Sequence, residues 1–87
     1  MNKIRRLDQA INFARSIASD ILMYHEDVVA AGLTNGDLYQ RLSHEIEEGR
    51  RLYLERVELS DGQSSEHFER ALNDVLVLKG VARLARD

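Results

Sequence analysis

The sequence predicts an all-α fold, a three-helix domain over residues 1–87 that is built on an antiparallel helical hairpin, with the third helix packed in its groove. Three observations support this prediction. The chain contains no proline, and residues that favour helices are abundant. Its apolar residues recur at steps of three and four, which is the helical period. The segment Ala31–Asp37 combines features that end one helix and begin another.

Within this segment, Gly32 can adopt the left-handed conformation that closes a helix. Thr34, followed three residues later by Asp37, is a capping-box pattern that opens a helix. We therefore expect a tight turn at residues 32–35, with the helices on either side of it running in opposite directions.

The first helix is expected at about residues 3–31. Its apolar side chains recur at alternating steps of three and four: Ile4, Leu7, Ile11, Ala14, Ala18, Ile21 and Val28. Three further residues widen this apolar side to about half of the circumference: Phe13, Ile17 and Tyr24. A helix with so wide an apolar side is expected to contact more than one neighbour.

The second helix is expected at about residues 36–57. Its apolar seam comprises Leu38, Leu42, Ile46, Gly49, Tyr53 and Val57. In an antiparallel hairpin, Gly49 lies opposite Ala18 and Tyr53 lies opposite Ala14. Glycine inside a helix costs about 0.5–1 kcal/mol relative to alanine. We therefore interpret Gly49 as a packing residue that lets the two helices approach closely, in preference to a ligand site.

The third helix is expected at about residues 65–84, after a polar break at residues 60–65. Its inward stripe comprises Phe68, Ala71, Leu72, Val75, Leu78 and Ala82. Beyond Gly80 two outcomes stay open. If the helix continues, an apolar stripe of Val77, Val81 and Leu84 is exposed, and self-association is the simplest explanation for it. If the helix ends at Gly80, these residues belong to a frayed tail.

Composition narrows the classes of function. The chain has 15 acidic and 12 basic residues, a net charge of -3, so no overall attraction to nucleic acid is expected. The absence of cysteine excludes disulfides, thiolate metal sites and cysteine nucleophiles. The basic start leads into charged sequence and not into an apolar signal core, so we expect a cytoplasmic protein that does not bind membranes.

The sequence predicts no enzyme, no cofactor and no metal site. His44 and Glu48 stand one turn apart, but a transition-metal site needs three or four convergent ligands. No Gly-x-Ser-x-Gly turn and no glycine-rich phosphate loop are present. Asp20 borders the apolar side of the first helix, and an ion pair with Arg50 or Lys79 is expected in preference to a catalytic role.

Two segments carry a further pattern. Residues 14–24 read ARSIASDILMY, and residues 45–57 read EIEEGRRLYLERV. This succession resembles a small uncharacterised bacterial helical domain, with the pattern SDI-x-x-Y followed by EEIEEGR-x-x-Y-x-x-RV, which in longer chains often follows a zinc-ribbon-like finger. The resemblance covers about residues 14–76. It implies a self-contained adaptor-like module with Asp20, Gly49, Arg50 and Tyr53 as motif positions. Because this chain has no cysteine, a role tied to the finger is not implied.

Two functions of different classes follow from these observations. We favour a non-catalytic module that associates with itself as a homodimer, or with a protein partner. The residues expected to make this contact are Val77, Val81 and Leu84. The alternative is a small regulatory nucleic-acid-binding protein that uses a basic patch on its first helix. That patch comprises Lys3, Arg5, Arg6 and Arg15.

Overall fold

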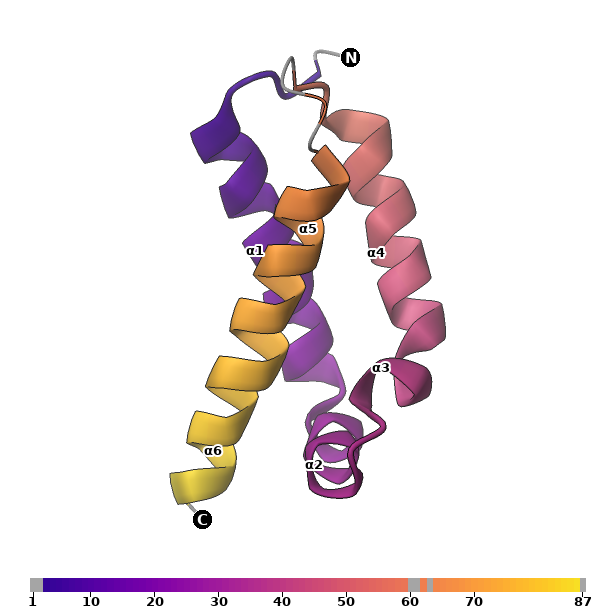
Figure 1. The fold of residues 1–87 in the computed structure, drawn as a ribbon, viewed down its shortest axis with the longest axis vertical. Helices are drawn as coiled ribbons and strands as arrows, with labels where there is room; N and C mark the ends of the chain where they lie inside the picture. Colours follow the sequence, from indigo (N-terminus) through magenta and orange to yellow (C-terminus); the bar gives the residue numbers. More distant parts are fainter. Residues whose placement is uncertain (1–2, 60–61, 63, 87) are drawn as a thin grey trace.

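The computed structural model describes residues 3–59, 62 and 64–86, and for residues 84–86 the backbone alone. The described residues form helices and no strand, so the predicted all-α class is confirmed (Figure 1). The elements are α1 (Leu7–Tyr24), α2 (Glu26–Asn35), α3 (Leu38–Arg41), α4 (Ser43–Arg56), α5 (Ser64–Leu72), the π-helix η1 (Asn73–Lys79) and α6 (Gly80–Arg86).

Three helical rods lie side by side: α1, α4 and the continuous rod formed by α5, η1 and α6 (Figure 1). The first and third rods run in the same direction, α4 runs in the opposite direction, and α2 lies across one end. The core fills the space between the rods. Its largest fully buried side chains are Tyr53, Phe68, Leu42, Leu72, Leu76, Val29 and Val75.

The predicted first helix, residues 3–31, is wrong at both ends. Ile4 lies outside α1, in a parallel bridge with Val57: its N–H donates to the Arg56 carbonyl at 2.7 Å, and its carbonyl accepts from Glu58 at 2.8 Å. The helix then breaks at His25, where φ is -133° and ψ is 38°. The apolar period continues across this break because α2 has an apolar side of its own, so the spacing of residues did not reveal the change of direction.

The predicted turn is also wrong in detail. Gly32 lies inside α2, buried, where a Cβ atom would come within 2.6 Å of the Leu38 Cα atom. The left-handed residue is Gly36, with φ of 75°. The N–H groups of Gly36 and Asp37 both donate to the Gly32 carbonyl, at 2.9 and 3.0 Å. Thr34 belongs to α2, so the next helix starts after Asp37. Gly32 is therefore required for close packing, and Gly36 for the backbone conformation.

The predicted second helix, residues 36–57, is divided at Leu42, where φ is -104° and ψ is 15°, into α3 and α4. Its predicted apolar seam is buried at every position: Leu38, Leu42, Ile46, Gly49, Tyr53 and Val57. Tyr53 stacks on Phe13 of α1 with ring centres 6.3 Å apart, and it packs on Phe68 of α5 at 5.1 Å. This aromatic cluster joins all three rods.

The third rod continues through Gly80 to Arg86. Its first half buries the predicted stripe of Phe68, Ala71, Leu72 and Val75. Beyond this point the prediction is wrong, because Leu78 and Ala82 are exposed while Leu76 and Gly80 are buried. The cause is η1: a π-helix bonds each residue to the fifth one along the chain and so has more residues per turn than an α-helix. The residues that face inward from η1 onward are therefore not those that a regular α-helical period predicts.

Candidate interaction surfaces

The structure separates Val77 from Val81, two of the three residues expected to form the exposed stripe. Val77 is partly buried and packs against the core. Val81 is 50% exposed on α6, and the side chain of Leu84 lies outside the part that the structure describes. Leu78, predicted to point inward, is 61% exposed instead. The sequence analysis missed Leu78 as a surface residue because a regular helical period contains no sign of a π-helix.

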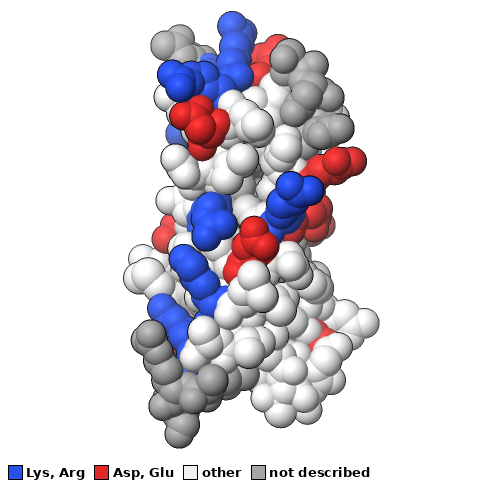
Figure 2. Space-filling model, turned by 60° about the vertical axis from the view of Figure 1, so that its left-hand side comes forward, with Lys and Arg blue, Asp and Glu red and all other residues white. Residues whose placement is uncertain are grey.

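Leu78 and Val81 belong to a surface that we call the C-terminal face, formed by Leu78, Lys79, Val81, Ala82 and Arg83. All five residues are exposed. Arg83 also forms an ion pair with Glu26, which ties α6 to α2. Residues 75–86 contain no Asp or Glu. Basic side chains are spread down this side of the molecule, with acidic side chains beside them in its upper and middle parts (Figure 2). The C-terminal face is therefore apolar and basic.

A second surface is a groove of about 290 Å³ between α1 and α4, which we call the α1–α4 groove. Its floor consists of Ile17, Ile21 and Gly49, all buried. Two large apolar residues line its rim and face water: Tyr24 is 76% exposed and Leu52 is 40% exposed. The acidic residues of the lining are Asp20, Glu45 and Glu48. The remaining residue of the lining is His25, and the lining includes no Lys and no Arg.

Gly49 makes the floor of this groove possible. A Cβ atom at this position would lie 2.7 Å from Cγ2 of Ile17 and 3.6 Å from Cζ of Phe68. The missing side chain thus allows α4 to approach α1 and α5 together. The contact on α1 is Ile17, one residue from the Ala18 that the hairpin register predicted.

The other motif positions lie in different surroundings. Asp20 is exposed at the rim of the groove, whereas Tyr53 is fully buried in the aromatic cluster. Arg50 forms ion pairs with Glu47 and with Glu69 of α5. The expected pair between Asp20 and Arg50 is therefore not formed. The other expected partner of Asp20, Lys79, lies on the C-terminal face.

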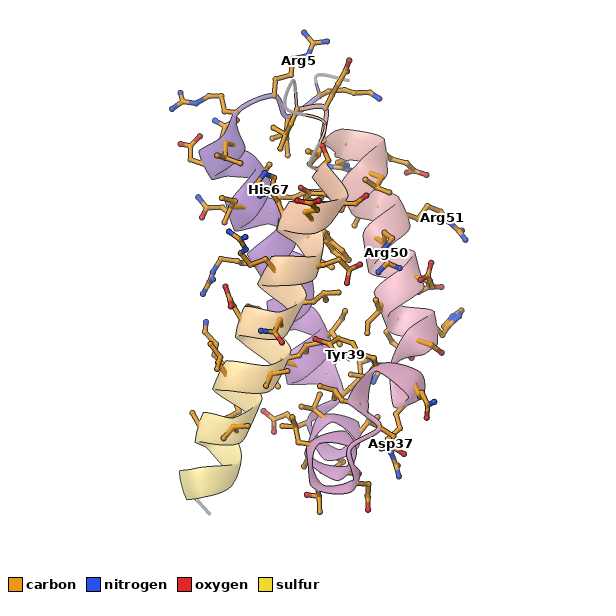
Figure 3. The ribbon with its side chains drawn as sticks, in the orientation of Figure 1. Arg5, Asp37, Tyr39, Arg50, Arg51 and His67 are labelled. Atoms are coloured by element: carbon orange, nitrogen blue, oxygen red, sulfur yellow. The ribbon has the colours of Figure 1, made fainter. Side chains whose placement is uncertain are left out.

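Arg50 ties α4 to α5. Its guanidinium lies 5.8 Å from the centre of the Phe68 ring, within the range of a cation–π contact. Figure 3 shows Arg50 on the side of α4 that faces α5, while the neighbouring Arg51 points away from it. The hydrogen bond to Glu69 is the main cause that raises the pKa of Arg50 above its ordinary value, and the charges of Glu69 and Glu47 act in the same direction. Arg50 is thus held as a cation within the fold.

Two further hollows lie near α2. One of about 140 Å³ lies between α2 and α6 and is lined by Leu22, Val29, Gly80 and the pair Glu26 and Arg83, among others. The other, of about 400 Å³, lies beside the turn after α2 and includes Tyr39 and Val77. Partial burial, followed by the charge of Glu69, raises the pKa of Tyr39.

Within residues 3–59, 62 and 64–86, no three His, Cys, Asp or Glu side chains converge on a point where a metal ion could bind. His44 and Glu48, the two donors that the sequence placed one turn apart, contact each other instead. Nε2 of His44 lies 3.1 Å from Oε1 of Glu48, and both side chains are exposed.

The basic residues of the nucleic-acid alternative do not form one helical face. Lys3, Arg5 and Arg6 precede α1. Each of the three arginines in this set has a carboxylate close by: Arg5 lies 3.7 Å from Glu58, Arg6 lies 3.2 Å from Asp8, and Arg15 lies 3.8 Å from Asp74. These carboxylates reduce the positive potential that a phosphate backbone would meet.

None of the described helices is both long enough and apolar enough to cross a membrane. The resemblance carried by residues 14–76 stays a prediction. Comparison with models of protein families, with curated proteins and with solved structures finds no match to this chain.

Proposed function

We propose that this protein is a non-catalytic module that associates with itself, as a homodimer, through the C-terminal face. One observation carries the proposal: the third rod stays helical through Gly80 to Arg86 and leaves Leu78 and Val81 exposed next to each other. Single exposed apolar residues are common on protein surfaces, but neighbouring ones on one helix are typical of a contact surface.

The size of the chain supports this proposal. A domain of 87 residues buries a smaller share of its surface than a large one, so its free energy of unfolding is low. Each Å² of apolar surface removed from water contributes about 25 cal/mol, so a contact between two copies would add to the stability of both. The basic residues of the first helix and of the segment before it support the nucleic-acid alternative less well, because carboxylates lie beside Arg5, Arg6 and Arg15.

The proposal includes the predicted hairpin. We interpret α1 and α3–α4 as its two arms, with α2 in place of a tight turn and the rod α5–η1–α6 lying against both arms. On this interpretation the three rods are a scaffold that holds the C-terminal face rigidly in water. A cytoplasmic location is part of the proposal.

The test is the molar mass in solution at several concentrations, measured by sedimentation equilibrium. We expect the wild type to approach the mass of a dimer as the concentration rises. The variant Leu78→Asp with Val81→Asp is expected to stay a monomer, because it places two charges in the contact. Leu54→Asp is the matched control: Leu54 is 41% exposed on α4 and lies outside both surfaces. A wild type that stays monomeric at every concentration would refute self-association.

A further inference from the structure

The α1–α4 groove has the chemistry of a site that receives a basic and apolar helix. Its buried floor is aliphatic, and Tyr24 and Leu52 extend the apolar surface outward to the rim. Around this apolar surface stand the carboxylates of Asp20, Glu45 and Glu48. Glu48 contacts His44, which lies outside the lining, whereas the lining itself contributes no Lys or Arg.

The C-terminal face has the complementary chemistry. Leu78 and Val81 supply exposed aliphatic groups, and Lys79 stands beside them. Arg83 adds a second cation, although its ion pair with Glu26 neutralises part of that charge. A helix that carries aliphatic groups on one side and cations at its edge matches a groove with an aliphatic floor and a carboxylate rim.

The charges of the two surfaces also favour one of the three possible contacts between two copies: face with face, groove with groove, or groove with face. If two C-terminal faces met, Lys79 of each copy would approach the cations of the other. If two α1–α4 grooves met, their carboxylates would approach one another. Like charges brought together across an interface cost several kcal/mol. The contact of a groove with a C-terminal face is the arrangement that pairs opposite charges.

We propose that the α1–α4 groove of one copy receives the C-terminal face of a second copy. This inference rests on the proposed self-association and names the surface that the C-terminal face covers. Both surfaces lie toward the end of the molecule that carries α2: the groove is formed by the last part of α1 and the first part of α4, and α6 lies at the same end (Figure 1). Where the contact forms twice about a two-fold axis, the two copies make a closed dimer.

The test exchanges the charges of the two surfaces. The groove variant carries Asp20→Lys with Glu45→Lys, and the face variant carries Lys79→Glu with Ala82→Glu. These positions leave the pair of His44 with Glu48 and the pair of Arg83 with Glu26 in place. In either variant alone, the groove and the face have the same sign of charge. In an equimolar mixture of the two, each groove meets a face of the opposite sign.

We expect each variant alone to dissociate at least about tenfold more readily than the wild type, and the mixture to form heterodimers within about threefold of wild-type affinity. Sedimentation equilibrium measures both affinities, and circular dichroism shows whether each variant is folded. Leu52→Asp, at the rim of the groove, is expected to weaken the dimer, whereas Leu54→Asp is not.

The outcomes separate this inference from the proposed function. A wild type that is always a monomer contradicts both. A second outcome is that the wild type forms a dimer and that Leu78→Asp with Val81→Asp dissociates it, while the groove variant and Leu52→Asp keep wild-type affinity. In that case the C-terminal face is a contact surface, but the groove is not the site that it contacts. A folded mixture that fails to form heterodimers also overturns the inference.

Discussion

At the scale of single residues, Arg50 illustrates how polar groups hold this fold together. Its guanidinium bonds a carboxylate on its own helix and one on α5, while its central carbon lies over the ring of Phe68. Arginine suits this position because one planar group can make several hydrogen bonds and still stack on an aromatic ring. The motif position thus has a structural role, joining α4 to α5.

Gly49 is the residue at which the absence of a side chain matters most. In an open helical position, replacing glycine with alanine stabilises a protein by about 0.5–1 kcal/mol. Here the new Cβ atom would approach Cγ2 of Ile17 to 2.7 Å, a distance that forces the helices apart. We expect Gly49→Ala to lower the free energy of unfolding by about 1–3 kcal/mol. Urea denaturation at one fixed protein concentration measures this change.

The control for this prediction is Ile17→Leu, which removes the branch at the β-carbon that Gly49 faces. Combined with Gly49→Ala, it is expected to recover part of the lost stability, since leucine has no Cγ2 methyl group at that place. An increase in stability for Gly49→Ala alone would show that the close approach of α4 to α1 is not required.

At the scale of elements, the π-helix η1 decides which side of the third rod meets the core. A residue added to a helical turn rotates all the following residues about the helix axis, relative to the apolar stripe that precedes the turn. Leu76 and Gly80 therefore take the inward places that a regular α-helix would give to Leu78 and Ala82. Because Gly80 has no side chain, α6 can lie close to Leu33 and Val29 of α2.

This rotation predicts opposite results for two neighbouring leucines. Leu76 is fully buried, so Leu76→Ala is expected to lower the free energy of unfolding by about 2–5 kcal/mol. Leu78 is exposed, so Leu78→Ala is expected to change the stability of the monomer by less than about 0.5 kcal/mol. Chemical denaturation at a concentration low enough to keep the chain monomeric compares them. The reverse order would mean that the third rod is a regular α-helix.

At the scale of the whole molecule, the charge is separated although the net charge is small. The α1–α4 groove is acidic, the C-terminal face is basic, and the total is -3. Such separation favours an ordered contact between copies over aggregation in many orientations, because mismatched arrangements bring like charges together. In the proposed dimer, a small domain would gain stability from this contact without a larger core of its own.

Association must then appear in thermal unfolding. For a chain that unfolds as a dimer, a tenfold rise in concentration adds about 0.7 kcal/mol of stability per chain by mass action, which corresponds to a Tm higher by about 3–6 °C for a domain of this size. We expect this shift for the wild type by scanning calorimetry. The variant Leu78→Asp with Val81→Asp should show a Tm that does not depend on concentration. Equal slopes for the two proteins would contradict a dimer formed through the C-terminal face.

The sequence by itself determined the all-α class and much of the core. Every residue of the predicted seam between residues 38 and 57 is buried, as is the first half of the stripe that starts at Phe68. The physical reason is local: apolar side chains spaced at the helical period lie on one side of any regular helix, whatever that helix packs against. The same argument identified Gly49 as a packing residue, although not its contact with Ile17.

Only the tertiary structure decided the direction of the chain and the position of both surfaces. The break at His25, and the use of Gly36 instead of Gly32 as the left-handed residue, depend on how α2 packs against α3 and α6. The periodic spacing of apolar residues carries no information about that packing. The π-helix turns Leu78 outward and places Gly80 against Leu33 and Val29 of α2, a contact between segments that lie far apart in the sequence. The α1–α4 groove combines residues about thirty positions apart, and its form follows from the packing of two rods on a third.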